Sequence, residues 1–215
     1  MRLVPRTGNR TGRKATIREE NERAIVKAAE EVFAERGYQG ATTGEIAERA
    51  GVPKANLHYY FPTKNDLYQE VLARIFSIWQ EAADALDDQE HPVEALTRYI
   101  YKKMEISRTE PLGSKIWAQE VMHGAPVIHE YLEKTLNDWT TSRVAMLERW
   151  INDGRIHAIN PHYLLYMIWA TTQHYADFER QISTLNDDRP MSDAQWEEAK
   201  KTVAEIILRG IGAIE

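Results

Sequence analysis

Apolar residues recur at intervals of three and four from residue 20 to the end of the chain, which is the spacing of amphipathic helices. The pattern predicts helices over residues 20–36, 42–50, 54–60, 64–86, 92–107, 112–122, 126–153, 161–183 and 192–211. No segment shows the sustained alternation of apolar and polar residues that marks a half-buried strand. We therefore expect an all-α protein.

Residues 41–64, ATTGEIAERAGVPKANLHYYFPTK, predict two short helices joined by a tight turn. Thr42 and Glu45 have the spacing of a capping box, which opens a helix, and Gly51 ends it. In the second helix only Leu57 faces inward. The positions left facing outward are polar or aromatic: Lys54, Asn56, His58 and Tyr59. Two helices joined in this way form a helix-turn-helix, whose second helix fits the major groove of B-DNA.

Charge is unevenly distributed along the chain, although the formal net charge is −6. Residues 1–65 carry 12 Lys and Arg against 8 Asp and Glu, and residues 66–215 carry 15 against 25. This division is expected when only an amino-terminal domain faces phosphates. Residues 1–18 contain six basic and no acidic side chains, which predicts a disordered arm that either contacts DNA or is a solvated tail. We therefore expect a DNA-binding domain over residues 19–65 and a second domain over residues 66–215.

Composition excludes several classes of protein. The chain has no Cys, so neither a disulfide framework nor a thiolate metal site is available. Its apolar runs are too short to span a bilayer and no signal peptide is recognisable, so we expect a cytoplasmic protein. The seven His are scattered, His129-Glu130 lacks the second His of H-E-x-x-H, and no phosphate-binding Gly-rich loop is present. We expect no catalytic or metal site and no cofactor.

Aromatic residues at helical spacing mark the second domain as a candidate ligand-binding domain. Trp169 and Gln173 lie one turn apart in the helix expected at 161–183, and Phe76 and Trp79 lie one turn apart in the helix at 64–86. A cavity lined by such rings, with one amide, would suit a flat heterocycle with carbonyl and N–H edges. Alternatively, the aromatic residues are ordinary core and the Gln is a dimer contact or is solvated.

Residues 41–64, with the preceding AIVKAAEEVFAERGYQG and the following TKNDLYQEVL, resemble the DNA-binding domain of the TetR family of bacterial repressors. The shared features recur in order over about fifty residues: Phe33, Gly37, Tyr38, Thr42, Thr43, Ile46, Ala47, Ala50, Gly51, Val52, Leu57, His58, Tyr59, Tyr60, Phe61 and Lys64. The resemblance implies phosphate contacts from Thr43, Tyr59 and Lys64. It also implies base-edge contacts from four residues of the second helix: Lys54, Ala55, Asn56 and His58.

The segments RYIYKKMEISR, HGAPVIHEYL and MIWATTQHYADF resemble the carboxy-terminal domain of TetR-family regulators of pyrimidine utilisation. These regulators bind uracil or thymine and then release DNA. The resemblance implies a pocket in which Gln173 pairs with the imide edge of the pyrimidine while Trp79 and Trp169 stack on it. The likeness is looser around Lys115, Trp117 and Gln119, and these side chains would change the ligand if they entered the pocket.

A homodimer is expected, because one helix-turn-helix makes too few contacts for specific repression. The helices at 161–183 and 192–211 would form the interface through five apolar residues: Leu165, Ile168, Val203, Ile206 and Ile207. A ligand held between the helices at 64–86 and 161–183 would tilt the former and lower the affinity for operator DNA. The alternative is a regulator of the same fold that answers to a different small molecule or to a protein partner. A closed aromatic cavity containing Gln173 would favour the small-molecule sensor.

Overall fold

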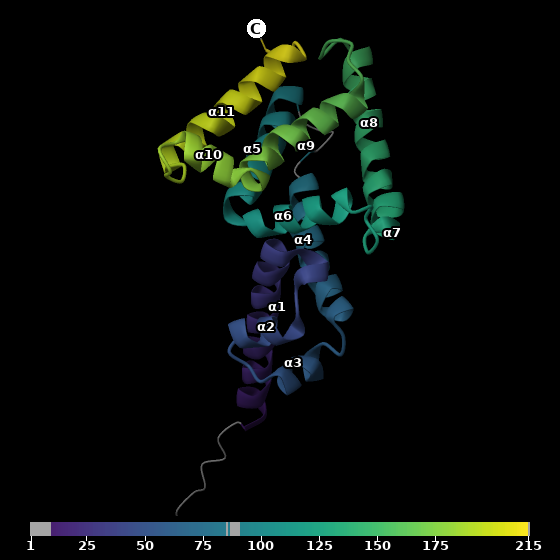
Figure 1. Ribbon diagram of the computed structural model, residues 1–215. Helices are drawn as coiled ribbons and strands as arrows, with labels where there is room; N and C mark the ends of the chain where they lie inside the picture. The colour runs from purple at the N-terminus through teal and green to yellow at the C-terminus, as the bar shows by residue number, and fades with distance from the viewer. Residues whose placement is uncertain (1–9, 85, 87–90, 215) are drawn as a thin grey trace, which may run out of the picture. The chain divides into compact units, whose positions relative to one another are not determined.

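The computed structural model describes residues 10–84, 86 and 91–214. Every regular element within these residues is helical, which confirms the predicted all-α class (Figure 1). The chain divides into two compact units, Met1–Leu72 and Ala73–Glu215. This division lies beyond the boundary expected at residue 65, because Leu67 and Tyr68 of α4 (Lys64–Ala83) are buried within the first unit. No helix in the described ranges is long and apolar enough to cross a membrane.

The first unit opens with α1 (Arg10–Gly40), which begins well before the expected helix at 20–36. The helix thus includes residues 10–18 of the stretch expected to be a disordered arm, and residues 1–9 lie outside the described residues. Lys, Arg, Ala and Ile are acceptable in helices, so a helix with packed later turns extends through this stretch at small cost. Gly37 leaves the helical conformation as predicted, with φ 67° and ψ 171°, a combination that suits glycine.

The short helices α2 (Thr43–Arg49) and α3 (Lys54–Tyr60) match the predicted helix-turn-helix. The Thr42 hydroxyl accepts a hydrogen bond from the Glu45 amide at 3.1 Å, whereas the Glu45 carboxylate pairs with arginines and does not complete the capping box. Gly51 provides the turn between the helices at a φ of 66°. The Phe33 and Tyr68 rings meet edge to face at 4.8 Å. Buried apolar residues of the unit include Ile25, Ala29, Val32, Phe33, Ile46, Ala47, Leu57, Leu67 and Tyr68.

The second unit combines the end of α4 with the helices that follow it. These are α5 (Pro92–Thr109), α6 (Pro111–Met122), α7 (His129–Tyr131), the π-helical η1 (Leu132–Leu136), α8 (Asn137–Asn152), α9 (Pro161–Asp177), α10 (Glu179–Leu185) and α11 (Asp193–Gly210). The helix predicted at 126–153 runs without a break from α7 through the π-helical turn η1 into α8. The one predicted at 161–183 is interrupted at Phe178, whose φ of −114° and ψ of 27° separate α9 from α10.

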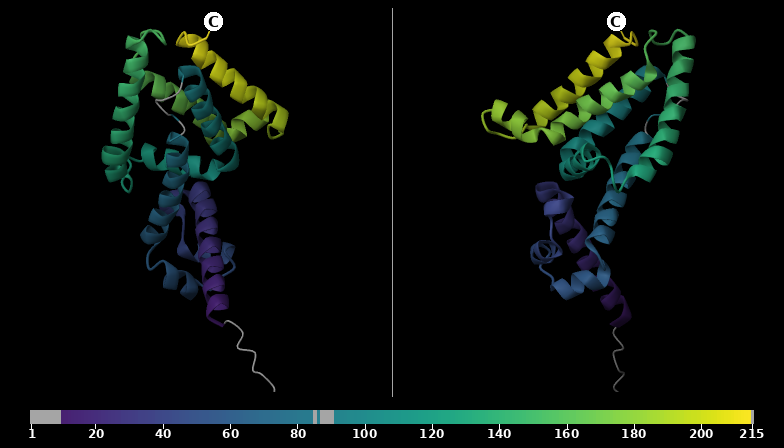
Figure 2. Two further views of the ribbon diagram at one scale, coloured as in Figure 1. Left: turned by 180° about the vertical axis from the view of Figure 1, so that it is seen from behind. Right: turned by 45° about the vertical axis from the view of Figure 1, so that its right-hand side comes forward.

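The core of the second unit lies where α5, α9 and α11 run side by side, with α8 against α9 (Figure 2). It includes Leu96, Ile100, Met104, Leu147, Trp150, Leu164, Leu165, Ile168, Val203 and Ile207. Both α9 and α11 are capped: the Asn160 side chain accepts a hydrogen bond from the His162 amide, and Ser192 and Gln195 form a complete capping box. These caps fix where α9 and α11 begin, and so which residues of the two helices reach the core.

Candidate DNA-binding surface and effector pocket

Helix α3 presents its polar and aromatic residues outward, as the sequence predicted. Leu57 is fully buried and holds the helix on the core of the first unit. The residues on the opposite side are exposed: Lys54, Ala55, Asn56, His58 and Tyr59. Tyr59 is 73 % exposed, so its hydroxyl is free to meet a phosphate. A short helix anchored by one apolar residue and covered with hydrogen-bonding groups is suited to reading base edges in the major groove.

Two further predicted contacts lie at the ends of the helix-turn-helix. Thr43 is the first residue of α2 and is partly exposed. The Nδ1 atom of His58 lies 3.2 Å from the Pro62 carbonyl oxygen, which can only accept, so this nitrogen carries the ring proton.

Lys64 does not have the exposed position expected of a phosphate contact. Its ammonium is partly buried and donates hydrogen bonds to the carbonyl oxygens of Tyr38, at 2.7 Å, and Ala41, at 3.1 Å. It also lies 4.5 Å from the centre of the Tyr38 ring. An ammonium has three N–H donors, and two of them are used within the first unit. Lys64 therefore connects the end of α1 to the start of α4.

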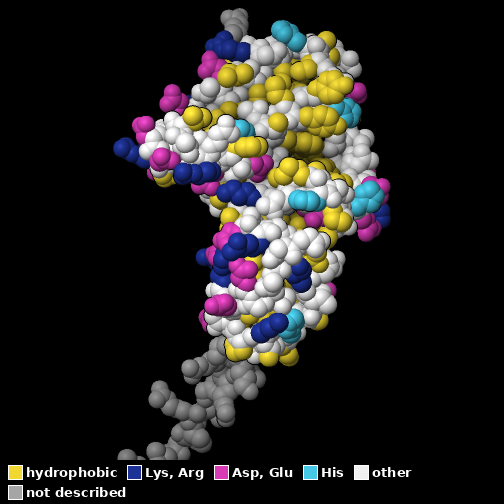
Figure 3. Space-filling view, viewed as in Figure 1, with side chains coloured by type: hydrophobic (Ala, Val, Ile, Leu, Met, Phe, Trp, Pro, Cys, Tyr) yellow, Lys and Arg dark blue, Asp and Glu magenta, His cyan; other side chains and the backbone are white. Residues whose placement is uncertain are grey.

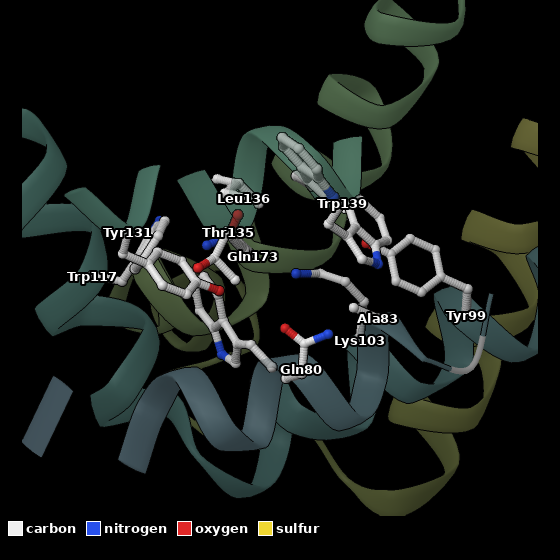
Figure 4. A pocket seen from close by; sticks show the side chains of 12 residues that line it. Gln80, Ala83, Tyr99, Lys103, Trp117, Tyr131, Thr135, Leu136, Trp139 and Gln173 are labelled. Carbon is white, nitrogen blue, oxygen red and sulfur yellow. Dashed lines mark hydrogen bonds between the residues drawn. The ribbon is translucent and has the colours of Figure 1, made fainter. Parts of the chain in front are cut away.

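The second unit contains a cavity, partly open to solvent, which every helix from α4 to α9 helps to line (Figure 4). Its walls are mainly aromatic. The lining residues are Trp79, Gln80, Ala83, Tyr99, Lys103, Trp117, Tyr131, Thr135, Leu136, Trp139, Trp169 and Gln173. Thr135 and Leu136 belong to the π-helical turn η1, a distortion that is frequent at functional sites. Aromatic walls with a few polar groups are typical of a small-molecule site.

Three of the four predicted ligand-binding residues, Trp79, Trp169 and Gln173, line this cavity. The fourth, Phe76, is not among the residues that line it. The Phe76 ring stacks on that of Tyr131 at 4.0 Å with 4° between the planes, so it supports a wall residue instead of forming the wall. Trp117, in the stretch where the resemblance is loose, does enter the cavity, with its ring 4.8 Å from that of Trp79.

Hydrogen bonds fix part of the cavity wall. The Trp169 indole N–H donates to the Tyr99 hydroxyl at 2.9 Å. Burial raises the pKa of Tyr99 far above its usual value, so its hydroxyl stays neutral. The Trp139 and Trp169 rings lie 6.2 Å apart. Trp139 differs from its neighbour, because its Nε1 is buried and has no hydrogen-bond partner among the described residues.

Lys103 is a polar residue of the cavity that sequence reasoning missed. Its Nζ lies 4.8 Å from the centre of the Trp79 ring, and burial lowers the pKa of this amine to about 8, while Asp177 acts in the opposite direction. Asp177 accepts a hydrogen bond from Ser114 at 2.6 Å, and burial raises the pKa of its carboxyl group. The signal was present in the sequence: Lys103 follows Tyr99 by four residues and so shares its helix face.

Four of the five apolar residues expected at the dimer interface lie in the core of the chain itself, and the homodimer stays a prediction. Leu165, Ile168, Val203 and Ile207 are buried in the core of their own unit and are not available to a partner chain. Ile206 of α11 is 66 % exposed. Three large apolar side chains of α9 are exposed as well: Tyr163, Tyr166 and Met167. Figure 3 shows hydrophobic side chains gathered on the face that carries α9. An amphipathic helix with apolar residues on two faces can serve both a core and an interface.

Both units match known protein families. Residues 25–71 match the tetR family of bacterial regulatory proteins, and residues 72–214 match the carboxy-terminal region of YcdC-like proteins. The chain therefore belongs to the TetR family of transcriptional regulators, and its helix-turn-helix is a DNA-binding domain. This family membership confirms that the protein is a regulator and not an enzyme.

Among curated proteins, the chain is similar to the HTH-type transcriptional regulator RutR of Escherichia coli strain K12. The two are 35% identical over 201 residues, which cover 94% of this chain and 95% of RutR. Among solved structures, the ketosteroid transcriptional regulator KstR2 of Mycobacterium tuberculosis has a TM-score of 0.73 at 20% identity, over 88% of this chain and 94% of KstR2. A putative fatty acid metabolism regulator of Clostridium perfringens has a TM-score of 0.64 at 22% identity, over 89% and 98% of the two chains. At these identities the two structures support the fold alone.

Proposed function

We propose that this protein is a repressor that binds operator DNA as a homodimer and is released by a planar pyrimidine such as uracil or thymine. The observation that carries the proposal is the aromatic cavity in which Trp79, Trp169 and Gln173 come together from α4 and α9. A primary amide presents both a donor and an acceptor, which match the N–H and C=O of a pyrimidine imide edge. The resemblance of MIWATTQHYADF to TetR-family regulators of pyrimidine utilisation supports the same class of ligand, and the similarity to RutR extends over most of the chain.

The DNA contacts follow from the surface of the helix-turn-helix. Exposed residues of α3, namely Lys54, Ala55, Asn56 and His58, would face base edges in the major groove. Thr43 and Tyr59 would hold phosphates on either side of the groove. Lys64 would act on DNA only indirectly, by setting the start of α4. A protein acting on operator DNA would work in the cytoplasm.

Release of DNA would depend on α4. This helix is continuous from Lys64 to Ala83, and it supplies three residues of the cavity wall, Trp79, Gln80 and Ala83. A ligand that draws α4 toward α9 would move the helix that begins beside the helix-turn-helix. Such a ligand shifts the equilibrium only by the difference between its affinities for the two states. The ligand must therefore bind the DNA-released conformation more tightly.

Dimerisation would use the exposed apolar residues of α9 and α11. Tyr163, Tyr166 and Met167 of α9 and Ile206 of α11 are large side chains left in solvent by the isolated chain. Burying them against a second copy in a two-fold arrangement would form a four-helix interface. Two linked helix-turn-helices would then bind two operator half-sites.

The test combines thermal shift with release of labelled operator DNA, using uracil, thymine, other nucleobases and reduced pyrimidines as probes. We expect at least one pyrimidine to raise the melting temperature and to release DNA over the same concentration range. Stabilisation without DNA release would contradict the proposed coupling. If no small molecule acts, the alternative of a protein partner gains support.

A further inference from the structure

We propose that the cavity selects a planar heterocycle that carries a negative charge, held by the ammonium of Lys103 with the indole N–H of Trp139 as a second donor. The inference rests on the proposed function, because it specifies the ligand class of the same cavity. It concerns the charge of the effector, which the pairing of Gln173 with an imide edge does not decide.

Lys103 supplies a positive charge that the cavity itself does not neutralise. Figure 4 shows its amine pointing into the middle of the cavity, from α5. No Asp or Glu is among the described residues that line the cavity. The Trp79 ring, 4.8 Å away, offers a cation–π contact, which replaces only part of the lost hydration.

The carboxylate that acts on Lys103 has other partners. Asp177 of α9 accepts the Ser114 hydroxyl at 2.6 Å and is also attracted by Lys115 and His174. Lys115 in turn pairs with Glu179 at 3.0 Å. Asp177 therefore serves several groups outside the cavity, and an anion inside it would give Lys103 a dedicated partner.

A second donor belongs to another lining residue, Trp139 of α8. The Nε1 atom of Trp139 is buried without a hydrogen-bond partner among the described residues, whereas Trp169 donates to Tyr99. A buried donor without an acceptor costs free energy, and such groups in native proteins call for an explanation. A second cation lies close to this residue, since the Arg143 guanidinium is 5.6 Å from the centre of the Trp139 ring. The lining and its surroundings thus offer donors and positive charge.

The balance of groups favours an anion over a neutral ring. Lys103 and Trp139 can only donate, while the amides of Gln80 and Gln173 can do both. A neutral pyrimidine dione gives Lys103 a carbonyl oxygen. An ionised ligand gives it an anionic acceptor, and the attraction between opposite charges in a poorly hydrated site adds to the hydrogen bond. The aromatic walls require that the charged ligand be flat.

Isothermal titration calorimetry on the full-length protein at pH 7 tests the inference with two matched pairs of probes. The first pair is orotate, a uracil with a ring carboxylate, against its neutral methyl ester. The second is barbiturate, a pyrimidine trione that is anionic at neutral pH, against uracil. We expect the anionic member of at least one pair to bind about 10-fold more tightly, or about 1.4 kcal/mol. The two pairs distinguish a carboxylate from an ionised ring as the source of the charge.

Variants assign the preference to Lys103. Lys103→Met keeps the length and apolar stem of the side chain and should abolish the preference for the anion. Lys102→Met removes the same charge from the exposed neighbouring position and should retain it. Uracil binding as tightly as both anions, or a preference that survives in Lys103→Met, would overturn the inference and leave the proposed pyrimidine response standing. Failure of all four probes to bind would overturn both.

Discussion

The ammonium group of Lys64 donates a hydrogen bond to the backbone carbonyl of Tyr38 at 2.7 Å and lies over the ring of the same residue. Carbonyl groups at the end of a helix have no partner within that helix, and Tyr38 and Ala41 lie where α1 ends. Lys64 satisfies both. Its first role is therefore to hold the helices of the DNA-binding unit together.

Replacing Lys64 with Met should lower the stability of the folded protein, and any loss of DNA affinity should follow from that change. The variant keeps the side-chain stem but loses two charged hydrogen bonds, so we expect the free energy of unfolding to fall by about 1–3 kcal/mol. Urea unfolding followed by circular dichroism measures this change. Lys54→Met, at an exposed position of α3, is the control. It should leave stability nearly unchanged. DNA binding should become less dependent on salt if Lys54 contacts a phosphate, or less selective among DNA sequences if it contacts a base. Unchanged stability in Lys64→Met with a weaker salt dependence would restore the phosphate role.

Replacing Gln173 with Leu should weaken the response to a pyrimidine effector. Leu has a similar size but cannot pair with an imide edge, and a binding site whose polar group is lost typically loses about 1–3 kcal/mol. The concentration of effector needed to release half of the bound operator should rise about 10-fold or more. Gln69→Leu, at an exposed position of α4 in the first unit, serves as the control. An unaltered effector response in Gln173→Leu would remove Gln173 from the pocket's recognition groups.

Replacing Ile206 with Glu should shift the protein toward monomer. A carboxylate in the middle of an apolar interface must be desolvated without a partner, which opposes association. Size-exclusion chromatography with light scattering would show a concentration-dependent loss of dimer. Met122→Glu introduces the same charge at a 75 % exposed residue of α6, outside α9 and α11, and should leave the dimer intact. Equal effects of the two substitutions would contradict the proposed interface.

Replacing Lys103 with Met should stabilise the effector-free protein at pH 7. Burial lowers the pKa of Lys103 from its ordinary value of 10.5 to about 8, so the charged form is disfavoured in the folded state. Below pH 8 the amine is protonated in both states and the cost of burying its charge is fully present. Between about pH 8 and 10.5 the folded protein binds fewer protons than the unfolded chain, so the cost declines as pH rises. The gain in melting temperature should therefore be largest at pH 7 and shrink by pH 10.

The neighbouring residue Lys102 provides the control for Lys103→Met. Lys102→Met, an exposed position, should change the melting temperature little at either pH. A Lys103→Met variant that is less stable at pH 7 would show that the amine has a stabilising partner in the folded chain. That partner would most directly be Asp177, whose charge acts on Lys103 in the structure.

Sequence patterns within a single helix were reliable guides. The inward position of Leu57 and the outward positions of Asn56 and Tyr59 follow from helical spacing alone, and the structure confirms them. Caps at Thr42 and Ser192 were recognisable for the same reason, because the groups that meet are three residues apart. The interruption at Phe178 carried no Gly or Pro signal and was missed.

By itself, the sequence determined that the protein is all-helical, where its helix-turn-helix lies and which face of α3 is exposed, because these depend on the spacing of residues along one helix. The tertiary structure alone decided the roles of residues that meet from distant segments. It placed Lys64 on the carbonyl of Tyr38, turned Phe76 onto Tyr131 and brought Lys103 beside Trp79. Helical periodicity identifies a face but not the segment that packs against it, so contacts of this kind exist only once the chain has folded.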